Sequence, residues 1–375
     1  MRRAKGSAGR PAVEPGGLQR RESALLHRAD RIGRPVTLIT GGAGFVGTNL
    51  ATRLLADGGH VRILDNLSRP GVEQNLRRLL HRYGKRVHVK LGDIRDPLLL
   101  RNAVRDAGAV FHFAAQVAVT TSVADPVSDF AVNAEGTVRL LEELRRLDDP
   151  PPLLFTSTNK VYGSLEHVRL RRRGERWEPT DDNVRANGIG EDARLDFCTP
   201  YGCSKGTADQ YVLDYAKTYG LPAIVFRMSC IYGPHQHGTE DQGWVAHFVL
   251  RTLADETLTI YGDGAQVRDV LHVADLVRAF LLVREGIDAL AGQAFNVGGG
   301  PDSTLSLLEL VDLLEELHGA RPALRSADER LGDQRWYVSD TSRLREATGW
   351  SPRIGPVEGV GSLYHDLLPA TATAA

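Results

Sequence analysis

Short runs of β-branched and aromatic residues alternate with helix-length stretches along this chain from about residue 36 onward. Runs separated in this way form right-handed βαβ units, which place the strands parallel in one sheet and cover both of its faces with helices. We expect strands at 36–39, 61–64, 87–89, 110–113, 153–155 and 224–226, followed by a further helix at 269–283 and a strand at 294–297. The chain is therefore predicted to have an α/β fold with a doubly wound parallel sheet.

Length and composition narrow the class of protein. A chain of 375 residues can form one large α/β unit with a smaller lobe attached. Its 46 Lys and Arg residues balance 47 Asp and Glu residues, so no overall field attracts nucleic acid or an anionic membrane surface. No apolar run is long enough to span a bilayer. We therefore expect neither nucleic acid nor a membrane as a partner.

Cysteine spacing and N-terminal composition bear on metal binding and location. Cys198, Cys203 and Cys230 show no C-x-x-C spacing, and His235 and His237 lack a third ligand. A structural zinc site or a disulfide framework is therefore disfavoured, no metal is expected, and a reducing cytoplasmic location fits best. Residues 1–34 are rich in Arg, Gly and Pro and are expected to form a disordered basic tail.

A glycine-rich turn follows the first predicted strand and opens a helix. Gly41, Gly44 and Gly47 stand in the spacing G-x-x-G-x-x-G. Glycine allows the backbone to pass close to a pyrophosphate, whose charge is stabilised by unpaired N–H groups at the helix N-terminus. Phe45 and Val46 at that N-terminus are therefore included among the expected contacts. A pattern of this kind between a strand and a helix predicts a dinucleotide site.

The end of the second strand indicates which dinucleotide binds. Asp65 can accept hydrogen bonds from both ribose hydroxyls and repels a 2′-phosphate, so NAD is expected in preference to NADP, although Arg69 nearby weighs the other way. The later strands of a doubly wound sheet end at the same edge. Further cofactor contacts are therefore expected at Asn66, Ser68, Arg69, Asp93, Ile94, Ala114, Ala115, Gln116 and Asn133.

A candidate catalytic group lies further along the chain. Tyr201 and Lys205 are four residues apart and would share one face of a helix, while Thr158 ends the fifth predicted strand. A phenol has an ordinary pKa near ~10, and a cation beside it favours the phenolate, so Tyr201 could act as a general base next to Lys205. Thr158 would hydrogen-bond the same substrate oxygen. By itself, this spacing also fits an exposed helix pair.

Taken in order, these motifs resemble those of the extended short-chain dehydrogenases/reductases that act on nucleotide sugars. The resemblance covers nearly all of residues 36–368 and includes the glycine turn and the stretches 157–163, 201–205, 227–234, 262–270, 295–299 and 349–352. It implies an NAD-binding Rossmann domain at 35–228, to which 269–298 returns, and a smaller substrate-binding lobe built from 229–268 and 299–370. It also implies a retained NAD, contacted by Tyr201 and Lys205 as well, and a homodimer formed through two helices per subunit, or a homotetramer.

The two residues after Thr158 separate reaction types within this family. By this resemblance, the related 4,6-dehydratases carry an Asp-Glu pair at these two positions, and the pair supplies the acid and the base that eliminate water. This chain has Asn159 and Lys160 there instead. Elimination is therefore disfavoured. The stretches 65–69, 116–122, 157–160, 195–197, 200–205, 241–245 and 333–335 are similar to the CDP-paratose 2-epimerases, also called CDP-tyvelose epimerases. This resemblance implies an isomerase that inverts C2 of a CDP-hexose through a keto-sugar.

The substrate contacts are expected mainly in the second half of the chain. Guanidinium groups suit a diphosphate, which points to Arg268, Arg330 and Arg335. Tyr261 could stack on the base. In many members of the family that this chain resembles, an Asn that contacts the substrate diphosphate stands at the position of Cys230. That contact is therefore not carried over to this chain. The expected set is completed by Thr121, Asn159 and Gln242.

Two other functions remain open from the sequence. A UDP-hexose 4-epimerase, or another nucleotide-sugar oxidoreductase, would use the same three catalytic residues on a different carbon. A non-catalytic NAD-binding protein would need none of them, and the intact Thr158, Tyr201 and Lys205 weigh against it.

Overall fold

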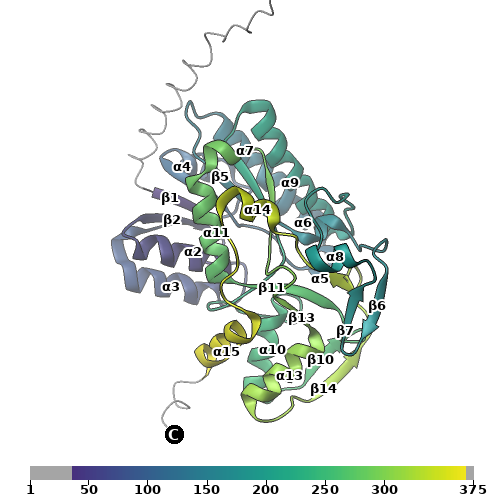
Figure 1. The fold of residues 1–375 in the computed structure, drawn as a ribbon. Coiled ribbons are helices and arrows are strands. Elements are labelled where there is room, and N and C mark those ends of the chain that lie inside the picture. The colour runs from purple at the N-terminus through teal and green to yellow at the C-terminus, as the bar shows by residue number, and fades with distance from the viewer. Residues whose placement is uncertain (1–35, 369–375) are drawn as a thin grey trace, which may run out of the picture.

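A seven-stranded sheet forms the centre of the computed structural model, which describes residues 36–368 (Figure 1). Its strands are all parallel and lie in the order β12-β8-β5-β4-β1-β2-β3. They are β1 (Val36–Thr40), β2 (His60–Asp65), β3 (Val87–Leu91), β4 (Ala107–His112), β5 (Leu153–Thr158), β8 (Ala223–Met228) and β12 (Ala294–Val297). The predicted doubly wound α/β fold is confirmed. The tail expected at 1–34 lies outside the described residues.

Helices cover both faces of this sheet, because successive side chains of a strand point to opposite faces. Ile39 packs in one core with the helices α2 (Phe45–Ala56), α3 (Val72–Tyr83) and α11 (Val273–Glu285). Its neighbour Leu38 packs in the other core with α4 (Pro97–Val104), α7 (Gly136–Arg145) and α9 (Thr199–Tyr219). Strands buried on both sides account for the nearly continuous apolar runs of the sequence.

A smaller group of elements lies below the carboxyl edge of the sheet in Figure 1. Strand β11 (Val267–His272) pairs with β9 (Cys230–Tyr232), β13 (Thr304–Ser306) and β15 (Trp336–Tyr337), and β10 (Leu258–Tyr261) pairs with β14 (Leu324–Ala327). Apolar residues of β9, β10, β11 and β13 share a third core with α10 (Trp244–Leu253), α13 (Leu307–His318) and α15 (Pro356–Leu367). A capping box between Ser306 and Glu309 begins α13.

The segment between Thr158 and Tyr201 is folded against this smaller group. It contains η3 (Asn159–Tyr162), an antiparallel hairpin of β6 (Leu170–Arg173) with β7 (Arg176–Pro179), and α8 (Asp182–Asn187). In the hairpin, Trp177 donates its backbone N–H to the Ala265 carbonyl at 2.9 Å. The remaining short elements are η1 (Gly84–Arg86), α5 (Val119–Ala124), α6 (Pro126–Phe130), η2 (Ala131–Glu135), α12 (Ile287–Leu290) and α14 (Ser342–Thr348).

The helix predicted at 269–283 begins four residues later than expected. Asp269 to His272 belong to β11, whose residues are all buried, and the His272 side chain accepts a hydrogen bond from Ala274 N at the start of α11. A fully buried strand shows no alternation of polar and apolar residues. The sequence pattern therefore ran from strand into helix without a visible break.

A buried ion pair ties α9 to β8. Arg227 donates from Nε and Nη2 to the two carboxylate oxygens of Asp209, each at 3.0 Å, and both side chains are at most 4 % exposed. We expect Arg227→Met to lower the free energy of unfolding by about 3–5 kcal/mol, because it removes the ion-pair partner of the buried Asp209 carboxylate. Urea denaturation followed by circular dichroism measures this loss.

The matched control removes an exposed arginine in the same way. Arg53 pairs with Asp57 at 2.8 Å on α2, and both side chains are 54 % exposed. Arg53→Met should change the free energy of unfolding by less than about 1 kcal/mol. Equal losses in the two variants would contradict the structural role of the Arg227–Asp209 pair.

Candidate active site

The turn between β1 and α2 lies where the strand order reverses, between β1 and β4. Gly41 has a φ of +67°, and a Cβ there would lie 2.7 Å from Ala114 N in the loop after β4. A Cβ at Gly47 would lie 2.4 Å from the Gly41 carbonyl oxygen. Both positions therefore require glycine, and they bring α2 and the two loops into contact at the edge where doubly wound proteins bind ligands.

The N-terminus of α2 is suited to an anion. Its N-cap residue, Gly44, supplies no side-chain hydrogen bond, and the first turn, which begins with Phe45 and Val46, holds no acidic residue. The helix is 12 residues long, so its N-terminal N–H groups and dipole favour negative charge. These features fit the pyrophosphate of a dinucleotide.

Asp65, at the end of β2, is fixed by the same turn. Its carboxylate accepts hydrogen bonds from Ala43 N at 3.0 Å and Leu67 N at 2.8 Å. Burial raises the pKa of Asp65, and the backbone N–H groups oppose that rise. The carboxylate is thereby oriented at the strand end, where it could accept hydrogen bonds from a ribose.

The neighbouring contacts predicted at the ends of β2 and β3 lie together. Asn66 donates to the Asp93 carboxylate at 3.0 Å and accepts from Ser68 N at 3.1 Å. Hydrogen bonds from Arg95 lower the pKa of Asp93 to about 2. Ile94 is buried in the core between β1 and α4, so it contributes packing at this position.

The contacts predicted after β4 connect the cofactor edge to α9. Ala114 donates its N–H to the Thr40 hydroxyl at 3.2 Å, and Ala115 is half-buried beside it. Gln116 N donates to the Asn133 side-chain oxygen at 2.9 Å. The Asn133 amide in turn donates to Ser204 Oγ at 3.1 Å. Asn133 thus joins this loop to the helix that carries Tyr201 and Lys205.

The predicted catalytic residues come together at the end of β5. Thr158 is the last residue of the strand, and Tyr201 lies in the first turn of α9, where its N–H donates to Ser122 Oγ at 3.1 Å. Burial raises the pKa of Tyr201 to about 12, while a hydrogen bond with Thr158 and the charge of Arg69 lower it. A buried phenol paired with a threonine hydroxyl is suited to moving a proton to and from one substrate oxygen.

Lys205 lies one helical turn beyond Tyr201 and is fully buried. Its Nζ donates to the Thr156 carbonyl at 2.6 Å and lies 4.2 Å from the centroid of the Phe155 ring. Burial lowers the pKa of Lys205 to about 7, and the carboxylates of Asp209 and Asp129 oppose that change. The lysine is therefore anchored to β5.

The cation that favours the Tyr201 phenolate in this structure is Arg69, whereas the sequence pointed to Lys205 for that effect. Arg69 donates from Nη2 to Gln242 Oε1 at 3.4 Å, so it reaches from the loop after β2 toward the smaller lobe. Its own pKa is lowered by burial and raised by Tyr201. Local spacing gave no signal for this contact, because Arg69 and Tyr201 come from distant parts of the chain.

The residue after Thr158 is held from the smaller lobe. Asn159 is buried and donates to Gln334 Oε1 at 3.2 Å, and Gln334 Nε2 donates to the Gly163 carbonyl at 2.6 Å. Gln334 lies within the stretch 333–335 that resembles the 2-epimerases, but the sequence pattern assigned this residue no role. Thr121, another expected substrate contact, is exposed on α5 next to Ser122.

Arg268 lies among buried charged groups. It is 7 % exposed, and its Nη2 lies 2.5 Å from Asp333 Oδ1. Lys160 Nζ donates to the Gly332 carbonyl at 2.9 Å and lies 3.8 Å from the same Asp333 oxygen. Two cations therefore converge on the Asp333 carboxylate. One of them, Lys160, is two residues beyond Thr158 in the chain.

The other predicted substrate residues divide into two groups. The Arg330 guanidinium lies 3.6 Å from the centroid of the Tyr261 ring, and both residues bond to Glu240. Arg335 is 59 % exposed and faces Glu329 at 3.7 Å and the ring of Trp177 at 5.6 Å. A cavity of about 130 Å³ lies beside the second group and is lined by Trp177, Gly262, Asp263, Gln266, Glu329, Asp333, Gln334 and Arg335.

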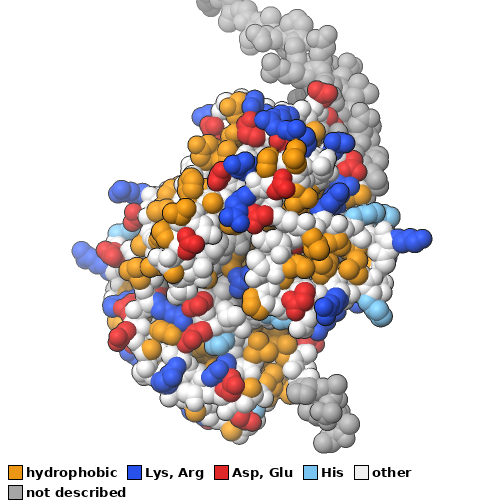
Figure 2. All heavy atoms as spheres, turned by 180° about the vertical axis from the view of Figure 1, so that it is seen from behind, with side chains coloured by type: hydrophobic (Ala, Val, Ile, Leu, Met, Phe, Trp, Pro, Cys, Tyr) orange, Lys and Arg blue, Asp and Glu red, His pale blue; other side chains and the backbone are white. Residues whose placement is uncertain are grey.

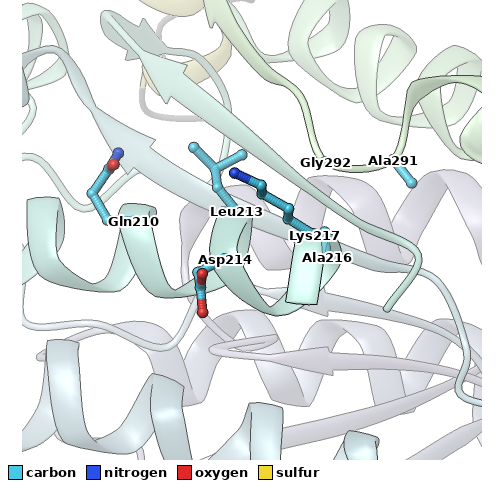
Figure 3. Close-up of a pocket in the computed structure, with 7 residues that line it drawn as sticks. All are labelled: Gln210, Leu213, Asp214, Ala216, Lys217, Ala291 and Gly292. Atoms are coloured by element: carbon cyan, nitrogen blue, oxygen red, sulfur yellow. The ribbon is translucent and has the colours of Figure 1, made fainter. Parts of the chain in front are cut away.

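A larger hollow, of about 500 Å³, lies at the other end of α9 (Figure 3). Gln210, Asp214 and Lys217 of α9 line it, together with Ala291 and Gly292 before β12. Lys217 is 16 positions beyond Tyr201 on the helix, which at 1.5 Å per residue places it roughly 24 Å away. This hollow is therefore separate from the candidate active site.

Two further expectations concern metals and membranes. Within residues 36–368, no group of three or more His, Cys, Asp or Glu side chains is arranged to hold a metal ion. His235 instead lies 3.3 Å from an Arg78 nitrogen, and His237 packs against Gly71. In the same part of the chain, no helix combines the length and the apolar character that crossing a membrane requires.

Comparisons with known proteins agree with this geometry. The sequence profile described as "NAD dependent epimerase/dehydratase family" matches residues 37–298. The chain is 41 % identical over 336 residues to a CDP-paratose 2-epimerase of Salmonella typhi, a match that covers 87 % of this chain and 97 % of that protein. It is 35 % identical to a UDP-glucose 4-epimerase of Mycolicibacterium smegmatis, with 86 % and 96 % covered.

Solved structures are similar over the same length. A UDP-glucose 4-epimerase of Thermus thermophilus in complex with NAD superimposes with a TM-score of 0.74 at 31 % identity and covers 89 % of this chain and 99 % of that one. A dTDP-glucose 4,6-dehydratase of Streptomyces venezuelae with NAD bound gives a TM-score of 0.76 at 29 % identity, with 90 % and 98 % covered. The expected cofactor, NAD, is confirmed.

We expect Asp65→Asn to weaken the preference for NAD over NADP by about 10-fold or more. The substitution keeps one oxygen that can accept from the Ala43 or Leu67 N–H, but it removes the charge that strengthens hydrogen bonds to the ribose and repels a 2′-phosphate. Dissociation constants of both cofactors, measured by isothermal titration calorimetry, give the ratio.

Asp57→Asn, at the exposed C-terminal end of α2, is the matched control and should leave the ratio unchanged. Tighter binding of NADP than NAD by the unmodified protein would refute the role assigned to Asp65.

Proposed function

The chain belongs to the NAD-dependent epimerase/dehydratase family, and from this membership we propose that it inverts C2 of a CDP-linked hexose of the paratose or tyvelose type. The observation that carries the proposal is the environment of Thr158. A phenol and an anchored lysine accompany it, and the two residues that follow it are an amide and an amine. The 41 % identity to a CDP-paratose 2-epimerase over nearly its whole length supports the choice of substrate.

The side chains around Thr158 favour epimerisation over elimination. Loss of water from a sugar requires an acid and a base beside the reacting carbons. Asn159 cannot supply either, and Lys160 is a cation tied to the Gly332 carbonyl. The nearby carboxylate of Asp333 is paired with Arg268 and Lys160. A reaction that only withdraws and returns a hydride and a proton fits these residues.

Each part of that reaction has a residue to perform it. NAD held in the crevice at Gly41 would supply the group that takes up a hydride from the sugar and returns it, and the positive charge of the oxidised ring would favour the phenolate of Tyr201. Tyr201 takes the proton of the C2 hydroxyl as C2 becomes a ketone, and gives it back after the sugar has presented its other face. Thr158 holds the same oxygen by a hydrogen bond, and Lys205 positions the start of α9 against β5.

The division of the chain follows from the same proposal. We assign cofactor binding to residues 35–228 together with 269–298, and substrate binding to 229–268 and 299–370. The position of Arg268, Tyr261 and Arg330 around β10 and β11 supports this assignment. The cytoplasmic location stays a prediction.

We also propose that two copies of the chain associate through α6 and α9. Val127 and Phe130 of α6 are 77 % and 54 % exposed, and Tyr211 on the adjoining α9 is 45 % exposed. Figure 2 shows hydrophobic side chains gathered along the left edge of the molecule, over these helices. Large apolar side chains grouped on one surface support a protein–protein contact.

A C2-deuterated CDP-hexose tests the proposed reaction. If the hydride leaves C2 and returns to it, the C2 epimer should form with its deuterium retained and with no net release of NADH. Proton abstraction next to a carbonyl would exchange the label with solvent. NMR of the product in light water distinguishes these results, and inversion at C4 instead would favour the UDP-glucose 4-epimerase reaction of the other relatives.

Tyr201→Phe should lower turnover by about 10²-fold or more, because it removes only the hydroxyl that carries the proton. Initial rates and a thermal melt measure this loss and the stability of the variant. Tyr219→Phe, at an exposed tyrosine near the C-terminal end of the same helix, is the control and should keep ordinary turnover. Ordinary turnover in the Tyr201 variant would place the base elsewhere.

A further inference from the structure

The charges beside Thr158, on the buried Arg268 and the half-buried Lys160 and Asp333, do not balance. Arg268 and Lys160 both face the Asp333 carboxylate, at 2.5 and 3.8 Å. The other titratable groups that act on Lys160 are the thiols of Cys230 and Cys198. Burial raises the pKa of Cys230, so that thiol is neutral near pH 7. At neutral pH, two positive charges therefore meet one negative charge.

Asp269, the next residue along β11, does not offset the excess. Its carboxylate bonds to the Ser229 hydroxyl and to Gly300 N, and burial raises its pKa. Successive residues of a strand point to opposite faces, so Asp269 faces away from the side where Arg268 meets Asp333. The group of Lys160, Arg268 and Asp333 therefore carries an uncompensated positive charge.

Retaining this charge is costly to the protein. A buried ammonium without a full partner is destabilising, and burial accordingly lowers the pKa of Lys160. Within the described residues, the Lys160 Nζ donates a hydrogen bond only to a carbonyl oxygen, that of Gly332 at 2.9 Å, which orients the ammonium without neutralising it. An anionic group of a ligand would supply the missing charge.

The position of Lys160 indicates which part of a ligand that anion belongs to. Its backbone N–H donates to Thr158 Oγ1 at 3.2 Å, so it is joined directly to the hydroxyl at the reaction centre. In a nucleotide sugar, the β-phosphoryl group is bonded to C1, and C1 is the neighbour of C2. A substrate whose C2 hydroxyl lies at Thr158 and Tyr201 therefore has its β-phosphoryl oxygens only a few bonds away.

We propose that Lys160 binds the β-phosphoryl group of the substrate together with Arg268, so that two cations hold the end of the diphosphate next to the reacting sugar. The proposal rests on the nucleotide-sugar substrate of the proposed function, but not on the identity of the base or on the carbon that is inverted. Under this proposal, Lys160 of the Asn159–Lys160 pair holds the anomeric end of the substrate in place while the sugar turns.

Binding of truncated ligands to the NAD-loaded full-length protein tests the proposal. Lys160→Met should weaken CDP by about 10- to 100-fold, as expected for loss of one charge-assisted hydrogen bond, and should weaken CMP, which lacks the β-phosphoryl group, by no more than about 3-fold. Lys160→Arg should restore most of the affinity for CDP. Isothermal titration calorimetry gives the dissociation constants of each ligand for the unmodified protein and the variants.

Two controls keep the result interpretable. Lys217→Met removes an exposed lysine of α9 and should change neither affinity. Thermal melts should show that Lys160→Met is folded, since it removes a half-buried, incompletely paired charge. Equal weakening of CDP and CMP, or no weakening of CDP, would overturn the proposal. If UDP binds better than CDP but shows the same selective loss, the assigned base is wrong and the role of Lys160 stands.

The pH dependence provides a second readout. Because the pKa of Lys160 is lowered by burial and an anion favours its charged form, affinity for CDP should be highest at neutral pH and should fall as the pH rises and the ammonium loses its proton. Ionisation of the Cys230 thiol would repel the diphosphate in every variant. The Lys160→Met protein should therefore show a shallower decline than the unmodified protein, and parallel profiles would contradict the proposal.

Discussion

The candidate active site depends on how closely three backbone segments approach at the carboxyl edge of the sheet. A side chain at Gly41 would collide with the loop after β4, and one at Gly47 would collide with Gly41 itself. The turn after β1, the start of α2 and the loop after β4 are thus fixed to one another by close packing, and the hydrogen bond from Ala114 N to the Thr40 hydroxyl adds to it. Asp65 adds hydrogen bonds to the backbone on either side of this contact. The cofactor crevice is consequently rigid at the point where a pyrophosphate needs exposed N–H groups.

A series of hydrogen bonds that begins at this crevice sets the position of the Tyr201 phenol, the candidate catalytic group. The loop after β4 bonds through Gln116 to Asn133, and Asn133 bonds to Ser204 in the second turn of α9. On the opposite side, Lys205 holds the same helix to the Thr156 carbonyl of β5. Tyr201 is therefore placed relative to both the crevice and Thr158 by groups that do not take part in proton transfer.

The sequence predicted those features that depend on neighbours along the chain. The strands of the central sheet, the glycine turn and the meeting of Thr158 with Tyr201 follow from periodicity, spacing and family resemblance. It missed what depends on contacts between distant segments. Arg69 reaches Tyr201 from the loop after β2, and Gln334 reaches Asn159 from the far end of the smaller lobe. The start of α11 was misplaced because β11 is buried on both faces and shows no alternation.

The balance of charges illustrates why composition could not reveal the site. The chain carries a net charge of −1, yet two buried cations, Lys205 and Arg268, and the half-buried Lys160 gather around β5 and β11. Lys205, Lys160 and Arg268 each donate to a backbone carbonyl, respectively that of Thr156, Gly332 and Val267. A carbonyl satisfies a donor and fixes its direction but does not cancel its charge. The fold thereby keeps a positive region beside Thr158 while the molecule as a whole is nearly neutral, so that attraction for an anion is confined to the candidate active site.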